Sequence, residues 1–204
     1  MIKCIIFDVG GVVVSDNIRN YVHRTAAKHY NTTIEKIIEA MKKHEKSFNT
    51  LDWKEDEYWN KVAKDLKIDK PSPPRLIWTE KYEEMTPVNQ DVINLIKKLK
   101  VNKYKLCVLS NTIQSHVDTN RKRGIYEMFD IEIFSCAPEI GILKPDIKIF
   151  EICLKKIESP AKECVFVDDL EENLIPAKKL GIKTILFKDI DQLKEDLIKL
   201  GVSI

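Results

Sequence analysis

Acidic side chains occur in two short apolar runs, where a charge is unusual. Asp8 interrupts the run KCIIFDVGGVVV, and Asp168 and Asp169 end the run ECVFVDD. A carboxylate is a competent nucleophile towards phosphorus only if its own charge and that of the phosphate are neutralised, which requires a divalent cation and a fixed ammonium group. Asp169 is a hard oxygen ligand suited to Mg²⁺, and Lys144 in the stretch GILKPD is the obvious ammonium. These residue types indicate phosphoryl-transfer chemistry if the fold brings them together.

Polar groups that can hold phosphate oxygens accompany these residues. Ser110 and Asn111 follow the apolar run KLCVL, and Gly11 follows Asp8 by three positions. We expect the Ser110 hydroxyl and the backbone N–H of Asn111 or Gly11 to bind phosphate, as polar groups near a helix N-terminus do. Lys144 would cancel the repulsion between the nucleophile and the phosphate.

The acidic pair and a nearby amide are expected to serve the metal. Asp8 would attack with one oxygen and hold Mg²⁺ with the other, and Asp169 would be a second ligand. Asp168 and Asn173 would orient Asp169 and the metal-bound waters without binding the metal themselves. Each of these residues alone is more simply a turn former or a helix cap. Polar residues follow four of the predicted strands at matching ends, and this coincidence is harder to explain in that way. They are Asp8, Ser110 with Asn111, Lys144, and Asp168 with Asp169.

The elements that must position these residues alternate along the chain. Short runs rich in branched and aromatic residues alternate with stretches whose apolar residues recur at intervals of three and four, which is typical of helices. The predicted strands are residues 3–9, 104–110, 130–135, 163–169 and 183–189, and the predicted helices are residues 92–100, 113–123, 147–157, 173–180 and 190–200. Gly124, Gly181 and Gly201 follow helical patterns, as C-terminal caps do. This pattern predicts an α/β class fold, doubly wound around a mostly parallel sheet, with ligands at the carboxyl ends of the strands.

Residues 16–85 interrupt the alternation and contain no convincing strand. Helical patterns cover residues 18–30, 33–48 and 54–66, and the stretch KIDKPSPPR at residues 67–75 is a predicted loop. All three tryptophans, Trp53, Trp59 and Trp78, fall in this segment, and we expect at least two of them in the core of a small helical bundle. We therefore predict an α/β core domain from residues 1–15 and 86–204 and a helical cap domain from residues 16–85.

Composition limits the class of protein. At 204 residues and 44% apolar, the chain can bury one core with a smaller appendage. With 34 basic and 32 acidic residues, it has no strong field that indicates nucleic acid or an anionic membrane as a partner. The five cysteines are scattered singly, mostly in apolar runs, so we expect reduced core residues and no zinc site. The sequence shows no signal peptide and no run of membrane-spanning length, and a cytoplasmic location is expected.

The order and spacing of four motifs resemble those of the haloacid dehalogenase (HAD) superfamily of phosphohydrolases. The motifs are FDVGGVV, VLSN, LKPD and VFVDDLEEN, and the similarity covers essentially the whole chain, with residues 16–85 where many members insert a helical cap. The resemblance implies a HAD-like fold and Mg²⁺-dependent hydrolysis of a small phosphorylated metabolite through an aspartyl-phosphate at Asp8. It further implies metal binding by Asp8, by the backbone carbonyl of Gly10 and by Asp169, with Ser110 and Lys144 in the catalytic set.

Gly10 departs from the family pattern, in which most members carry a second Asp two positions after the nucleophile. That Asp protonates the leaving group, and such general acid–base catalysis contributes ~10²–10⁴ in rate, or roughly 3–5 kcal/mol of barrier. The backbone carbonyl for the metal survives at Gly10, whereas the acidic side chain does not. Asp16 and His23 are candidate substitutes. Some relatives with a similar Asp-x-Gly motif are sugar-phosphate phosphatases resembling glucose-1-phosphatase, whose anomeric leaving group needs less protonation.

Three other functions are alternatives to a phosphatase. A weakly active or inactive member would bind a phosphorylated ligand or a protein partner, and a metal-dependent phosphatase assay separates this case. A 2-haloacid dehalogenase would use its Asp without metal, but the acidic pair does not suit that chemistry and no halide cradle is evident. A signalling receiver domain has a similar sheet, but there the acidic pair comes early in the chain rather than late.

Overall fold

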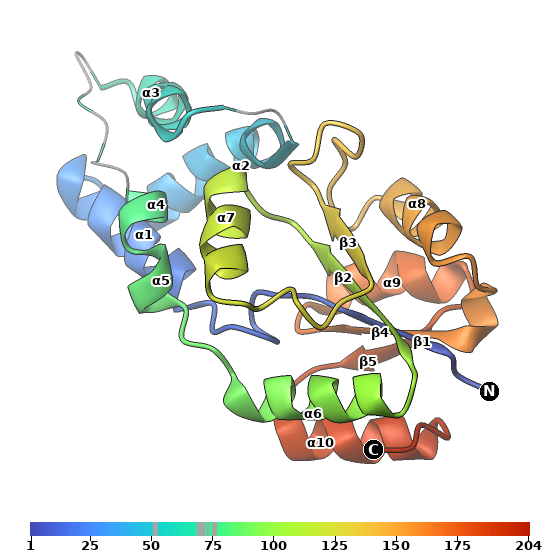
Figure 1. Ribbon diagram of the computed structural model, residues 1–204. Coiled ribbons are helices and arrows are strands. Elements are labelled where there is room, and N and C mark those ends of the chain that lie inside the picture. The colour runs from blue at the N-terminus through green and yellow to red at the C-terminus, as the bar shows by residue number, and fades with distance from the viewer. Residues whose placement is uncertain (51–52, 69–71, 73, 75–76) are drawn as a thin grey trace.

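A single parallel sheet lies at the centre of the protein (Figure 1). The computed structural model describes residues 1–50, 53–68, 72, 74 and 77–204. In this part of the chain the strands are β1 (Cys4–Phe7), β2 (Lys105–Ser110), β3 (Ile131–Phe134), β4 (Cys164–Asp168) and β5 (Lys183–Leu186). Their order is β3-β2-β1-β4-β5, and all four neighbouring pairs are parallel. The predicted doubly wound α/β fold is confirmed, and each of the five predicted strands is present near its predicted place.

Helices cover both faces of the sheet. In Figure 1, α6 and α10 lie on one side, and α8 and α9 lie on the other. The central strand shows the cause, because successive side chains of a strand point to opposite faces: Ile5 and Phe7 belong to the apolar cluster with α6 and α10, whereas Cys4 and Ile6 belong to the cluster with α8 and α9. The helices of this part are α6 (Gln90–Val101), α7 (Gln114–Lys122), α8 (Ile147–Ile157), α9 (Glu171–Lys179) and α10 (Ile190–Lys199), with a 3-10 turn η1 (Ala161–Glu163).

Local signals fix where these helices begin and end. The side chain of Asn89 accepts the Val92 N–H at the start of α6, and Asp189 does the same for Gln192 at the start of α10. The glycines expected to follow helix ends have positive φ, with +70° at Gly124, +85° at Gly181 and +79° at Gly201. The caps predicted at these three glycines are therefore in place.

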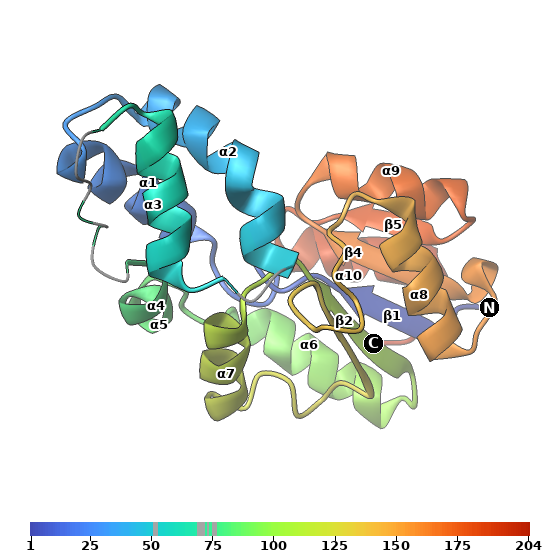
Figure 2. The same ribbon diagram turned by 90° about the horizontal axis from the view of Figure 1, so that it is seen from above.

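The segment between β1 and α6 is helical and has its own apolar cluster. It contains α1 (Asn17–His29), α2 (Ile34–Thr50), α3 (Glu55–Asp65), α4 (Ile77–Glu80) and α5 (Tyr82–Met85). We call residues 17–85 the helical segment, and Figure 2 shows it beside the α/β core. Trp59 is fully buried, while Trp53 and Trp78 are partly buried against the same cluster. Most of the loop predicted at residues 67–75 lies outside the described residues.

The short helices α4 and α5 have no counterpart in the sequence prediction. Glu55 at the start of α3 holds α4 in place: its carboxylate accepts the backbone N–H groups of Trp78 and Thr79 at 2.8 and 3.2 Å and the indole N–H of Trp59 at 3.1 Å. A four-residue helix has little intrinsic stability in water. Its formation therefore depends on this tertiary contact, which no local sequence pattern reveals.

Two expectations from composition concern cysteines and membranes. The thiols of Cys4, Cys107, Cys153 and Cys164 are fully buried in the sheet core, as expected of small apolar residues. Within the described residues, no helix combines the length and the apolar character needed to cross a bilayer.

Candidate active site

The first predicted site residues meet at the carboxyl end of the central strand. Asp8 directly follows β1, which lies between β2 and β4, so the ends of both neighbours flank it. The Lys144 Nζ atom lies 2.9 Å from Oδ1 of Asp8 and 2.7 Å from Oδ2 of Asp168. All three residues are buried, with exposed fractions of 7% for Asp8, 4% for Lys144 and 0% for Asp168. The structure thus places one ammonium between two carboxylates at the sheet end, where ligands of such sheets bind.

Lys144 reaches this position on a long loop, since β3 ends at Phe134. The Asn111 side chain holds the loop, because its amide nitrogen donates to the Lys144 carbonyl and its oxygen accepts the Lys144 N–H, both at 2.8 Å. We expected only the backbone of Asn111 to matter, for phosphate. Its side chain is instead a positioning group for Lys144, a role that sequence reasoning missed because the two residues lie 33 positions apart.

Asp168 is fixed from the side of α9. The Asn173 amide donates to both of its carboxylate oxygens, at 3.0 and 3.1 Å, and the Leu170 N–H donates to Oδ1 at 2.8 Å. We expected Asp168 and Asn173 to orient Asp169 and the metal-bound waters. In the structure their contacts lead to Lys144 instead, so this pair orients the ammonium.

Three carboxylates form a group that fits a metal ion. Asp8, Asp168 and Asp169 each offer an oxygen atom, and these atoms all lie within 4.8 Å of one another. Carboxylate oxygens are the ligands that Mg²⁺ prefers. Both oxygens of Asp168 accept hydrogen bonds from Lys144, Asn173 or Leu170, whereas Lys144 and the Val9 N–H contact Asp8 at Oδ1. Oδ2 of Asp8 and the carboxylate of Asp169 are therefore best suited to an ion.

Gly10 and Gly11, which follow Asp8, differ in the space available for a side chain. Gly11 has φ +75°, and a Cβ atom there would stand 2.2 Å from Oδ2 of Asp169, so only glycine leaves room for that carboxylate. A Cβ atom at Gly10 would meet nothing within 4 Å. The Gly11 N–H donates to the Val14 carbonyl at 2.8 Å. Gly11 was predicted to bind phosphate through this N–H, which in the structure is already used within the loop.

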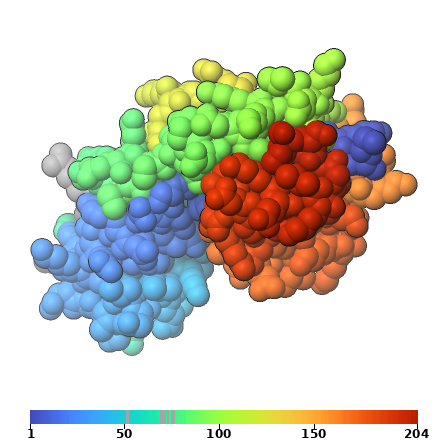
Figure 3. Space-filling model, turned by 90° about the horizontal axis from the view of Figure 1, so that it is seen from below, coloured from blue at the N-terminus to red at the C-terminus, as the bar shows by residue number. Residues whose placement is uncertain are grey.

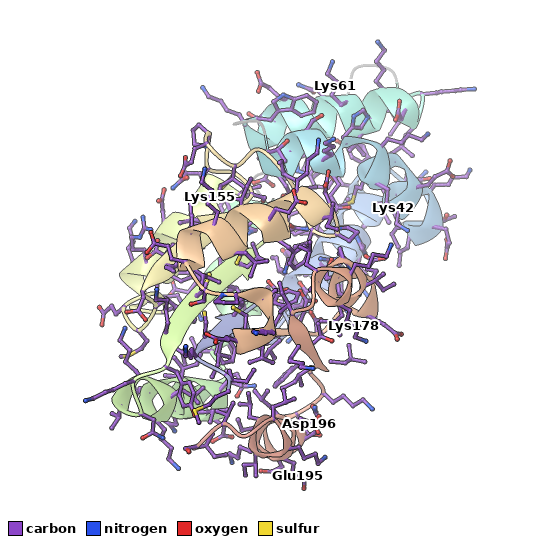
Figure 4. The ribbon with its side chains drawn as sticks, turned by 90° about the vertical axis from the view of Figure 1, so that its right-hand side faces the viewer. Lys42, Lys61, Lys155, Lys178, Glu195 and Asp196 are labelled. Carbon is purple, nitrogen blue, oxygen red and sulfur yellow. The ribbon has the colours of Figure 1, made fainter. Side chains whose placement is uncertain are left out.

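A cavity of about 670 Å³ opens above the carboxylates, between the α/β core and the helical segment. Figure 3 shows the helical segment in blue and cyan against the C-terminal part of the core in red and orange. In Figure 4, Lys42 and Lys61 mark the helical segment, and Lys178 and Asp196 mark the core. Seven of the nine predicted site residues line the cavity: Asp8, Gly10, Ser110, Asn111, Lys144, Asp169 and Asn173. Gly11 and Asp168 do not line it. Arg19 and His23 of the helical segment line the cavity, as does Asp16 directly before it.

Burial and neighbouring charges shift the acidity of these groups. Burial raises the pKa of Asp8, with a further contribution from the charge of Asp168, and Lys144 only partly offsets this. Burial and Asp168 raise the pKa of Asp169 to about 6. Burial by itself would lower the pKa of Lys144, but Asp8 and Asp168 outweigh it and raise it. The lysine therefore stays a cation, and the cluster carries negative charge that a divalent ion would neutralise.

Comparison with known proteins places this chain in a family. The model of the haloacid dehalogenase-like hydrolases matches residues 2–181. Bifunctional epoxide hydrolase 2 of Sus scrofa is 30% identical over 120 residues, which is 55% of this chain and 21% of that protein, so the match spans about a fifth of that relative.

Solved structures agree with the fold. A predicted HAD-like family hydrolase from Porphyromonas gingivalis superposes with a TM-score of 0.74 at 20% identity, covering 98% of both chains. A HAD family enzyme from Bacteroides thetaiotaomicron, in complex with magnesium and inorganic phosphate, gives a TM-score of 0.65 at 20% identity and covers 92% of this chain and 95% of its own. With most of its length matched by the family model, this chain belongs to the haloacid dehalogenase-like hydrolases.

Proposed function

We propose that this hydrolase is a Mg²⁺-dependent phosphatase that acts on a small phosphate monoester through an aspartyl-phosphate at Asp8. The observation that carries the proposal is the buried Lys144 ammonium, 2.9 Å from Asp8 and 2.7 Å from Asp168, beside the third carboxylate of Asp169. This arrangement provides a carboxylate nucleophile with a fixed cation at hand, which is what attack on a phosphate requires.

The metal would be held by one carboxylate oxygen of Asp8, the backbone carbonyl of Gly10 and the carboxylate of Asp169. Such an ion, when bound, neutralises the charge that gathers on the phosphoryl oxygens. Support comes from the oxygen-only donor set and from the Bacteroides structure, which holds both magnesium and phosphate.

The chain's own residues divide the remaining work. Asp8 attacks the phosphorus, and Lys144 suppresses the repulsion between the two anions. Ser110, 4% exposed at the end of β2, and the backbone N–H of Asn111 donate to phosphate oxygens from the cavity wall. Asp168 and Asn173 keep the ammonium in place. Departure of the alcohol and attack of water on the acyl phosphate complete the turnover.

The helical segment would act as a cap on the core. We propose residues 16–85 as the cap domain and residues 1–15 and 86–204 as the core domain, since the helical segment has an apolar cluster of its own and forms one wall of the cavity. Closure of a cap excludes bulk water from the reacting groups. A cavity of about 670 Å³ has room for a small phosphorylated metabolite such as a sugar phosphate.

The cellular setting is also a proposal. Buried thiols suit a reducing compartment, and a net charge of +2 gives no field for nucleic acid. We propose a cytoplasmic enzyme whose partner is a small phosphorylated molecule.

The test is turnover of p-nitrophenyl phosphate with and without Mg²⁺ by the wild type, Asp8→Asn and the control Glu172→Gln, which changes an exposed carboxylate at the cavity rim. We expect Mg²⁺-dependent turnover that Asp8→Asn abolishes and Glu172→Gln keeps. Retained turnover in Asp8→Asn contradicts the nucleophile assignment. A wild type that binds phosphate without hydrolysing any ester indicates the binding-protein alternative, and metal-free halide release from a 2-haloacid indicates a dehalogenase.

A further inference from the structure

The reaction proposed above leaves one proton without a donor. When the P–O bond breaks, an ordinary alcohol departs as an alkoxide, which is a poor leaving group unless an acid protonates it. Asp8 is the nucleophile, Lys144 is held between two carboxylates, and Asp169 faces the metal position. Gly10 has no side chain, and the space beside it is empty to 4 Å. For a leaving group that needs a proton, the candidate donors within the protein are the other titratable side chains that line the cavity.

Two histidines on the cavity wall are poorly suited to the task. The Nε2 atom of His116 lies 2.9 Å from the Trp78 carbonyl, and its ring is stacked on Tyr82 at 3.7 Å, so it already has a structural partner. Burial lowers the pKa of His116 to about 4. Burial, with the charge of Arg19, also lowers the pKa of His23, which disfavours the cationic form that would donate a proton.

Asp16 lines the same cavity as the nucleophile Asp8. The chain after Asp8 turns back on itself: Gly10 and Val14 pair in a short bridge, and the Val14 N–H donates to the Val9 carbonyl at 2.9 Å. Two residues after Val14, Asp16 emerges on the wall of the cavity that Asp8 also lines.

The side chain of Asp16 is not used for the task that an aspartate at this position usually has. Asp16 is the N-cap residue of α1, yet its carboxylate makes no capping hydrogen bond. Oδ2 instead lies 3.2 Å from Nε of Arg19, and the side chain is 37% exposed, into a region that includes the cavity. Burial raises the pKa of this carboxyl, with Arg19 opposing the shift. A carboxyl that is partly buried, held by one arginine and open to the cavity is suited to proton transfer.

We infer that Asp16 is the general acid and base of this active site, in place of a side chain at position 10. The inference rests on the proposed phosphatase function. In the first step an oxygen of Asp8 bonds to phosphorus, the bond from phosphorus to the alcohol oxygen breaks, and protonated Asp16 gives its proton to that oxygen. In the second step water attacks the phosphorus of the aspartyl-phosphate, the bond from phosphorus to the Asp8 oxygen breaks, and the water passes a proton to the Asp16 carboxylate. Inorganic phosphate leaves, and Asp8 and protonated Asp16 are restored.

The experiment compares two esters of similar size with different leaving groups, p-nitrophenyl phosphate and benzyl phosphate, with the full-length protein and Mg²⁺. Single-turnover release of the alcohol, with enzyme in excess, isolates the first step. Asp16→Asn should slow benzyl alcohol release by ~10² or more, and p-nitrophenol release by less than about tenfold, because the stable nitrophenolate leaves without a proton. Asp16→Glu should restore part of the benzyl rate. Glu45→Gln, an exposed carboxylate on α2 that also lines the cavity, should change both rates by the same factor.

The result that overturns the inference is an equal loss for both esters in Asp16→Asn, or a loss selective for benzyl phosphate in Glu45→Gln. The circular dichroism spectrum and thermal unfolding midpoint of Asp16→Asn should match the wild type, which separates a chemical loss from misfolding. If the wild type hydrolyses neither ester with Mg²⁺, the phosphatase function fails. If it hydrolyses both and Asp16→Asn shows no selectivity, only the role of Asp16 fails.

Discussion

Gly11 and Gly10 are adjacent, yet adding a methyl group should have very different effects at the two positions. In Gly11→Ala the new Cβ would stand 2.2 Å from Oδ2 of Asp169, whereas an ordinary contact begins near 3.4 Å. The carboxylate of Asp169 must therefore shift by about 1 Å, and a displacement of that size in an active site can cost ~10²-fold in rate. The positive φ of +75° adds about 1–2 kcal/mol of backbone strain. Gly10→Ala meets nothing within 4 Å and has no positive φ.

The assay measures three quantities for Gly11→Ala, Gly10→Ala and the wild type: turnover of p-nitrophenyl phosphate, the Mg²⁺ concentration that gives half of full activity, and the free energy of unfolding in urea. We expect Gly11→Ala to lose ~10² in turnover, to need more Mg²⁺ and to lose about 1–2 kcal/mol of stability. Gly10→Ala should stay near the wild type in stability and in Mg²⁺ requirement. If Gly11→Ala matches Gly10→Ala in both activity and Mg²⁺ requirement, Asp169 does not bind the metal from the position described.

Two further predictions concern stability. Lys144→Met should lower the free energy of unfolding by about 3–5 kcal/mol, because it leaves the buried carboxylates of Asp8 and Asp168 without their cation. Adding Asp168→Asn should recover part of this loss. A loss under ~1 kcal/mol in urea unfolding of the single variant argues against the ion pair. Burial lowers the pKa of His116 from 6.5 to about 4. Between these two pH values only the unfolded chain takes up the proton, so the free energy of unfolding should fall by up to about 3 kcal/mol as the pH drops from 6.5 towards 4. His116→Gln should lack this component, and urea unfolding at pH 7 and pH 4 with the same loss in both proteins would refute it.

The sequence predicted the α/β core well because its signals are local. Each strand is a short apolar run that the surrounding helices bury, and glycines mark the ends of α7, α9 and α10. The short helices α4 and α5 were missed, because the Glu55 carboxylate on α3 holds α4 in place, and that contact is tertiary.

Some features of the candidate site could likewise be predicted from the sequence, and others could not. Residue type and position were enough to group Asp8, Ser110 and Asp169, which lie at or directly after strand ends, with Lys144 in the loop after β3, because parallel strands all end at the same edge of the sheet. Hydrogen bonds between distant residues were not visible. The clamp of Asn111 on Lys144 and the use of the Gly11 N–H by a neighbouring carbonyl appear only when the chain is folded.

The sequence by itself determined which chemical groups are available, since the carboxylates, the ammonium and the hydroxyl are fixed by residue type and by their order along alternating strands and helices. Only the tertiary structure decided how these groups are shared: Asp168 orients the lysine, Asp169 lies over Gly11, and Asp16 lines the cavity shared with Asp8. The physical reason is that periodicity reports which face of an element is buried, whereas the direction of a polar side chain is set by partners that can lie anywhere in the chain.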